Sequence, residues 1–134
     1  MTTFSWPVRV YYEDTDAGGV VYYANYLRFY ERARTEWLRA IGFEHQRLRS
    51  EDGIVFAVRN VEIDYLKPAV LDDALQVEAT ISDLRRASMT FEQRLLRGDD
   101  VLSKATVKIV CLDSDGFRPV PIPQILRERI DAQQ

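Results

Sequence analysis

One stretch of the chain, residues 24–41, has the periodicity of a long amphipathic helix, and four strand-like segments follow it. Apolar residues recur in this stretch at steps of three and four, so they line one face. They are Leu27, Tyr30, Ala33 or Arg34, Trp37 and Ile41. Gly42 stands where a helix commonly ends. A single long helix with one apolar face needs a cover, and a sheet built from the strands provides it.

Five segments have the composition or the alternation of β-strands. One precedes the helix and four follow it, and residues 75–82 alternate apolar and polar side chains with a period of two. The predicted strands span residues 8–12, 54–66, 75–82, 88–97 and 101–112. Strands joined by tight turns are antiparallel. The sequence therefore predicts an α+β fold, with an antiparallel sheet of about five strands wrapped around one central helix. Residues 44–53 are predicted to form a short helix or loop, and residues 124–131 a short polar helix.

Composition restricts the class of protein. A chain of 134 residues with 46% hydrophobic content fits one globular domain, residues 1–134. The net charge of −3 argues against a broad basic surface for nucleic acid. No stretch approaches the roughly 18 apolar residues of a membrane span. A single cysteine excludes an internal disulfide, and residues 1–7 do not resemble a signal peptide, so we expect a cytoplasmic protein.

The residues that bind metals are scarce. His45 and Cys111 are the only histidine and the only cysteine, which argues against a zinc site. We expect His45 at the surface and Cys111 packed inside its strand. We find neither a phosphate-binding loop nor a dinucleotide fingerprint. The sequence thus predicts no metal and no separate cofactor.

Asp16 is the strongest catalytic candidate. It follows the first predicted strand and precedes Gly18-Gly19, which breaks that strand before the helix begins. The first turn of a helix carries unpaired N–H groups and a partial positive charge, both suited to an oxyanion. A carboxylate beside them can attack a carbonyl carbon or activate a water molecule, and the sequence leaves both roles open. The structural alternative for Asp16 is an ordinary turn or helix-entry aspartate.

For the residues near Asp16, other than Tyr23, we expect structural roles. Glu13 and Asp14 are predicted to be an acidic strand end in solvent. The aromatic residues after the glycines are predicted to pack in the core, with the exception of Tyr23, and the alternative is that they shape an acyl pocket. They are Tyr22, Tyr26, Phe29 and Tyr30.

The order of elements and the residues around Asp16 resemble a known family. Arg9-Val10, four residues, Thr15-Asp16, two residues, Gly19 and a Val-Val pair are similar to the active-site signature of the hotdog-fold 4-hydroxybenzoyl-CoA thioesterases. Residues 11–22, 29–36 and 68–73 most resemble the Tol-Pal-associated acyl-CoA thioesterase branch. This resemblance implies hydrolysis of short-chain or aromatic acyl-CoA, with coenzyme A as part of the substrate.

The resemblance also implies roles for individual residues. The backbone N–H of Tyr23 would be the principal oxyanion donor, and Asn25 would assist near the substrate. The branch often carries a histidine where this chain has Tyr23. Because a backbone donor is indifferent to its side chain, we expect this change to alter the shape of the pocket and leave the mechanism intact.

Coenzyme A carries several phosphates, which call for basic residues at the mouth of the site. The best candidates lie at a connection between strands, Arg85, Arg86 and Ser88, followed by Arg59 and Lys67. Solvated turn charges are the alternative for each. In hotdog relatives the pocket forms between protomers, which implies a homodimer or a dimer of dimers, a homotetramer. Two other functions stay open: a thioesterase for acyl carrier protein, and a non-catalytic acyl-binding or envelope-assembly partner.

Overall fold

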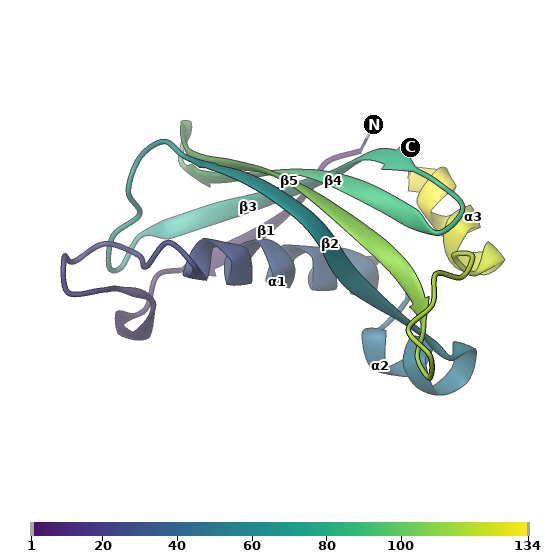
Figure 1. The fold of residues 1–134 in the computed structure, drawn as a ribbon. Helices are drawn as coiled ribbons and strands as arrows, with labels where there is room; N and C mark the ends of the chain where they lie inside the picture. Colours follow the sequence, from purple (N-terminus) through teal and green to yellow (C-terminus); the bar gives the residue numbers. More distant parts are fainter. Residues whose placement is uncertain (1, 134) are drawn as a thin grey trace.

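The structure, a computed structural model, describes residues 2–133, and its sheet curves over one long helix (Figure 1). All strand pairs are antiparallel, and the strand order is β1-β3-β4-β5-β2. The strands are β1 (Phe4–Arg9), β2 (Ile54–Tyr65), β3 (Ala74–Leu84), β4 (Ser88–Arg97) and β5 (Asp100–Asp113). The helices are α1 (Asn25–Ala40), α2 (His45–Arg47) and α3 (Gln124–Gln133), with single turns η1 (Tyr12–Asp14) and η2 (Leu48–Asp52). The predicted α+β hotdog architecture is confirmed.

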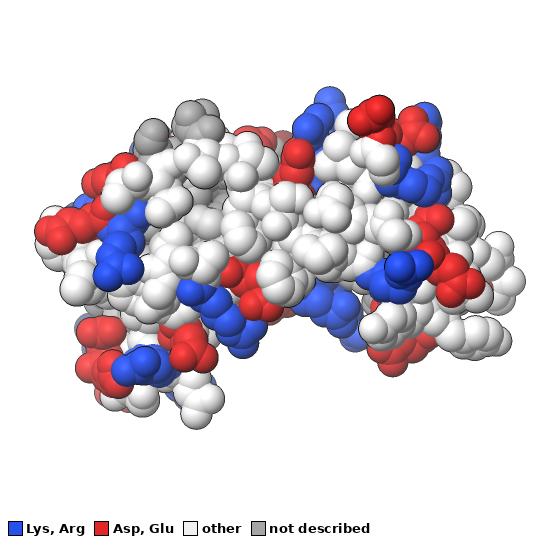
Figure 2. Space-filling model, turned by 180° about the vertical axis from the view of Figure 1, so that it is seen from behind, with Lys and Arg blue, Asp and Glu red and all other residues white. Residues whose placement is uncertain are grey.

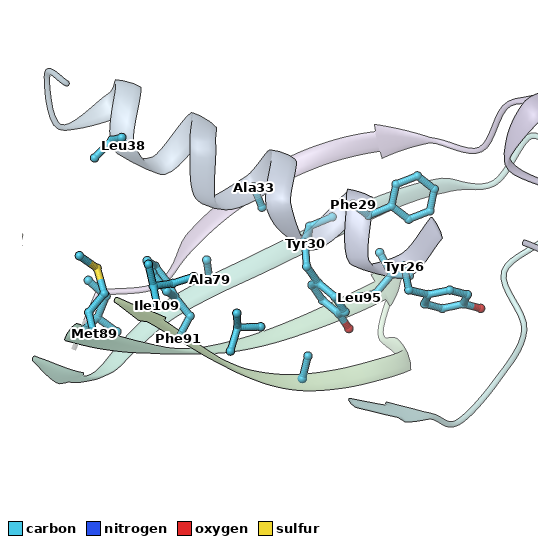
Figure 3. Packing of buried hydrophobic residues seen from close by; sticks show 14 of the residues in the cluster. Tyr26, Phe29, Tyr30, Ala33, Leu38, Ala79, Met89, Phe91, Leu95 and Ile109 are labelled. Atoms are coloured by element: carbon cyan, nitrogen blue, oxygen red, sulfur yellow. The ribbon is translucent and has the colours of Figure 1, made fainter. Parts of the chain in front are cut away.

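Helix α1 supplies one side of the core and the sheet supplies the other (Figure 3). The buried residues of the helix lie at helical spacing and include Tyr26, Phe29, Tyr30, Ala33 and Leu38. The prediction that Leu27 belongs to this face is wrong, because its side chain is 40% exposed. Each residue turns the helix by about 100°, so a face centred on Tyr26 and Tyr30 leaves Leu27 at the side.

The first strand begins earlier than predicted. The ladder with β3 runs from Phe4 to Arg9 and includes Pro7, whereas the prediction began after that proline. Proline is tolerated here because β1 is an edge strand with one neighbour, so no second strand needs its missing N–H. Tyr12, predicted as the end of the strand, begins the turn η1. This early end leaves residues 10–24 free to form the loop before α1.

Strand β2 is the other edge of the sheet, paired with β5 alone. It is therefore not adjacent to β3, the next strand along the chain. Residues 66–73 instead cross between the two strands and contact the loop before α1, where Val21 N–H donates to Ala69 O at 2.9 Å. A bridge between Val20 and Val70 adds a second contact. This crossing segment supports the loop that carries Asp16.

Several smaller predictions are confirmed. Gly42 follows the end of α1 with a φ of 98°, a conformation that glycine adopts without strain. Cys111 is fully buried, and this burial raises the pKa of its thiol to about 11. His45 is exposed, as predicted. No helix in residues 2–133 has both the length and the apolar composition to cross a membrane. On the face drawn in Figure 2, basic and acidic side chains are intermixed.

Candidate active site

Asp16 lies at the tip of a small hairpin that leads into α1. Its N–H donates to Val20 O at 2.9 Å, and two residues earlier Asp14 O accepts the N–H of Tyr22 at 2.9 Å. The two arms of the hairpin are therefore paired. The outgoing arm ends at Tyr23, just before α1 begins. The hairpin thus brings Asp16 and the helix entrance to the same end of the molecule.

The carboxylate of Asp16 is exposed and has one oxygen held in place. Gly18 N–H donates to its Oδ1 at 2.8 Å. A Cβ at Gly18 would lie 3.2 Å from that oxygen, closer than most real contacts, so glycine suits this approach. Asp16 also lines an open hollow of about 530 Å³, together with Tyr12, Thr15 and Leu71 among others. The second oxygen, Oδ2, accepts no hydrogen bond from residues 2–133.

The backbone N–H groups of Tyr23 and of the next residue, Ala24, have no acceptor among residues 2–133, whereas those of Val21, Tyr22 and Asn25 are all paired. Tyr23 stands two residues before the first residue of α1, where the helix dipole favours negative charge. The Tyr23 side chain is 62% exposed, so solvent or a ligand can approach this position. The N–H is therefore available as a hydrogen-bond donor to an oxyanion.

Asp14 is not the solvated acid that the sequence predicted, because it is only 4% exposed. Its Oδ2 accepts the N–H of Tyr11 at 2.8 Å, and its Oδ1 accepts Nδ2 of Asn25 at 2.7 Å. The carboxylate therefore ties together the chain before the hairpin and the first residue of α1. Asn25, predicted to assist near the substrate, is buried and directs its side-chain amide to Asp14. Glu13 is exposed, as expected.

Tyr65, at the end of β2, is a residue that sequence reasoning missed. Its hydroxyl donates to Tyr23 O at 3.0 Å, and its ring meets those of Tyr23 and Tyr26 edge to face. Burial and the neighbouring tyrosines raise the pKa of Tyr65, so the hydroxyl keeps its proton at neutral pH. Tyr65 thus holds the carbonyl group of Tyr23, the same residue whose N–H is free. Tyr22, predicted to pack in the core, is instead 47% exposed.

The predicted phosphate-binding residues lie far from Asp16 in the same chain. Arg85 and Arg86 occupy the β3–β4 turn beside α3, at the opposite end of the sheet from the loop before α1 (Figure 1). Strand β3 alone, at 11 residues, separates these ends by about 35 Å. Arg85 pairs with Asp83 at 2.8 Å, which raises the pKa of the guanidinium. Ser88 opens β4, and its carbonyl oxygen accepts the N–H of Arg85 at 2.8 Å.

The two remaining basic candidates lie on or next to β2. Arg59 is exposed at a bulge, where the register with β5 skips one residue between Val58 and Asn60. Lys67 follows the strand and pairs with Asp100 at 3.1 Å. Neither residue lines the hollow beside Asp16. Within residues 2–133, no group of three or more His, Cys, Asp or Glu side chains is arranged to hold a metal ion.

Comparison with known proteins agrees with this geometry. Residues 10–130 match the thioesterase-like superfamily. The acyl-CoA thioesterase YbgC of Haemophilus influenzae is 54% identical over 121 residues, which cover 90% of this chain and 89% of that protein. A probable thioesterase from Bartonella henselae has a TM-score of 0.88 at 38% identity, covering 91% of this chain and 100% of the other.

A solved 4-hydroxybenzoyl-CoA thioesterase, at 23% identity and a TM-score of 0.87, has the same fold; the match covers 96% of this chain and 98% of that one. An antiparallel sheet wrapped around one long helix is the hotdog fold, and the hairpin that carries Asp16 lies at the start of that helix. The chain belongs to the thioesterase-like superfamily, as the residues around Asp16 predicted.

Proposed function

We propose that this protein hydrolyses acyl-CoA thioesters at the hairpin before α1. The observation that carries the proposal is the unpaired N–H of Tyr23 at the entrance of α1, on the same hairpin as the exposed carboxylate of Asp16. The match to the thioesterase-like superfamily runs over residues 10–130 and so includes this hairpin, and the match to the acyl-CoA thioesterase YbgC of H. influenzae covers 90% of the chain. Short-chain and aromatic acyl groups are the proposed substrates.

The chemistry follows from these two groups. The thioester oxygen accepts the N–H of Tyr23, which stabilises the negative charge that develops on it. In one route, Asp16 attacks the carbonyl carbon, the C–S bond breaks, and coenzyme A leaves as a thiolate. Water then hydrolyses the resulting mixed anhydride and restores the carboxylate. In the other route, Asp16 takes a proton from a water molecule that attacks the carbonyl carbon directly. The C–S bond then breaks, and the protonated Asp16 returns its proton to the leaving thiolate.

A complete site requires two copies of the chain in this proposal. Within one copy, β3 separates the arginines from the hairpin by about 35 Å. This distance is longer than the pantetheine arm that joins a thioester to the phosphates of coenzyme A. Arg85, Arg86 and Ser88 therefore serve the Asp16 of a neighbouring copy. The unpaired edge of β2, a strand of 12 residues, is the surface through which two sheets would join. Arg59, at the bulge of this strand, would then lie near the partner. We propose a dimer or a dimer of dimers.

The first experiment measures thiol release from short-chain, long-chain and aromatic acyl-CoAs, comparing wild type with Asp16→Asn. We expect a loss of roughly 10²-fold or more in kcat. Asp99→Asn, in the exposed β4–β5 turn, is the matched control and should retain full activity. An Asp16→Asn variant as active as wild type, or a wild type inert on the whole panel, would refute the proposal. The same panel on acyl carrier protein tests that alternative carrier.

Two further measurements resolve the details. After single-turnover hydrolysis in H₂¹⁸O, ¹⁸O in the Asp16 carboxylate identifies Asp16 as the nucleophile, because a general base takes up no oxygen from water. For the shared site, Asp16→Asn subunits are mixed with subunits carrying Arg85→Ala and Arg86→Ala. Mixed dimers regain one intact site if the arginines act on the partner's substrate. Light scattering that shows a monomer would contradict the shared site.

A further inference from the structure

A second cavity lies away from Asp16, between the middle of α1 and the sheet. It has a volume of about 80 Å³, several times the 10–15 Å³ that one water molecule needs. Most of its lining is apolar, formed by Trp37, Leu38, Met89, Phe91 and Ile109 with Phe56 and Val58. Its polar lining residues are Glu31, Arg34, Thr35 and His45. Figure 3 shows Leu38 of α1 on the side of Met89, Phe91 and Ile109. Its volume is about half of the roughly 150 Å³ of a cavity that binds benzene, so a short aliphatic group fits inside and an aromatic ring enters only in part.

The polar groups of this cavity gather around Arg34. Its Nη1 donates to Oε1 of Gln93 at 2.8 Å, and Gln93 is 1% exposed, so the guanidinium reaches the buried centre of the sheet. Gln93 is in turn held by Tyr30 O, which accepts its Nε2 at 3.1 Å. The cavity thus has a polar end formed by a positioned guanidinium and an apolar end formed around Trp37 and Phe91.

The charge of Arg34 has no carboxylate partner at ion-pair distance within residues 2–133. Its one direct partner is the neutral amide of Gln93. Burial lowers the pKa of Arg34 to about 10, which leaves it charged at neutral pH. Glu31, one helical turn away, favours the charged form, but it is exposed and solvent screens its field. A partly buried cation without a counter-ion is the chemistry that an anionic ligand completes.

We propose that this cavity binds a small carboxylate with a short aliphatic or aromatic body. The carboxylate pairs with the guanidinium of Arg34, and the body packs against Trp37, Met89 and Phe91. Arg34 lies nine residues beyond Asn25, about 14 Å along the helix axis, so this site is distinct from the hollow at Asp16. Binding here does not depend on thioester hydrolysis. The acid that the proposed reaction releases nevertheless belongs to the same chemical class.

The test is direct binding of benzoate and butyrate to the intact protein, followed by ¹H–¹⁵N NMR. Trp37 lines the cavity, whereas Trp6 lies on the edge strand β1, so the two indole N–H signals provide a probe and an internal reference. We expect both carboxylates to shift the signal of Trp37 and leave that of Trp6 in place. The neutral isosteres benzamide and butyramide should bind roughly tenfold or more weakly, because a charge-assisted pair is lost.

Variants identify the responsible charge. Arg34→Gln should weaken carboxylate binding roughly tenfold or more and leave amide binding unchanged. Arg28→Gln, an exposed arginine on the same helix, is the matched control and should bind as wild type does. No shift of Trp37 at about 10 mM carboxylate, or equal binding of acid and amide by wild type, would overturn the proposal. If Arg34→Gln fails to fold, the comparison of acid with amide in wild type still decides it.

Discussion

Replacing Asp14 with asparagine tests how the helix entrance is held. The carboxylate of Asp14 is 4% exposed and accepts two hydrogen bonds, from Tyr11 N–H at 2.8 Å and from Asn25 Nδ2 at 2.7 Å. An amide at this position has one carbonyl oxygen and one NH₂ group. Its carbonyl oxygen can accept one of the two hydrogen bonds, but its NH₂ group then faces the other donor and cannot bond to it. Losing one hydrogen bond to a buried charged group costs about 1.5–3 kcal/mol, so we expect Asp14→Asn to lower the free energy of unfolding by this amount.

The assay is urea unfolding, and a double variant isolates the pair. Combining Asp14→Asn with Asn25→Asp exchanges donor and acceptor: the new amide donates to the new carboxylate, and its oxygen still accepts Tyr11 N–H. The double variant should therefore lose less stability than the sum of the losses in the two single variants, by about 1 kcal/mol or more. Glu13→Gln, an exposed neighbour, should stay within about 0.5 kcal/mol of wild type. A single variant as stable as wild type, or strictly additive losses, would refute the reasoning.

Two other predictions concern Tyr65, which contacts Tyr23 just before α1, and His45, which contacts Thr35 within α1. Tyr65→Phe removes only the hydroxyl that donates to Tyr23 O, so kcat should fall about fivefold with KM little changed. Tyr11→Phe, at an exposed tyrosine outside the hollow, is the control, and equal kcat values for the two variants would contradict this. Although His45 is exposed as a whole residue, it lines the cavity beside α1, and partial desolvation there lowers the pKa of its ring. The unfolded chain therefore takes up the proton more readily. The stability that the neutral ring contributes is present above about pH 6.5 and is lost as pH falls. The stability difference between wild type and His45→Gln should therefore shrink on acidification, and a constant difference across thermal unfolding at pH 5–8 would contradict it.

The parts of the fold that could be predicted depend on local patterns. The long helix was predicted within one residue at each end. Apolar residues at steps of three and four form a pattern within the helix itself, so it can be recognised without knowing what the helix packs against. Strand β4 was predicted with the observed bounds, and β3 from its alternation. The first strand was misplaced because Pro7 counts against a strand in general. Only its position at the sheet edge makes that proline acceptable.

The site residues likewise fall into those that the local sequence predicts and those that depend on distant contacts. Asp16 and Tyr23 were identified from a short continuous motif, which needs no knowledge of distant contacts. The carboxylate of Asp14 was misread because its partner Asn25 is 11 residues away, and Tyr65 was missed because it meets Tyr23 across 42 residues. Arg34 was counted as one possible member of a helix face. Its role depends on Gln93, 59 residues further along the chain.

The sequence by itself determined the fold class, the family and the candidate catalytic pair, because periodicity and a contiguous motif are local properties of the chain. The tertiary structure alone decided which polar groups are buried and what they bind, and that β2 lies at an edge instead of beside β3. It also decided that Arg85 and Arg86 lie at the opposite end of the sheet from Asp16. The physical reason is that burial and pairing arise between segments far apart in sequence, and only the folded chain brings those segments together.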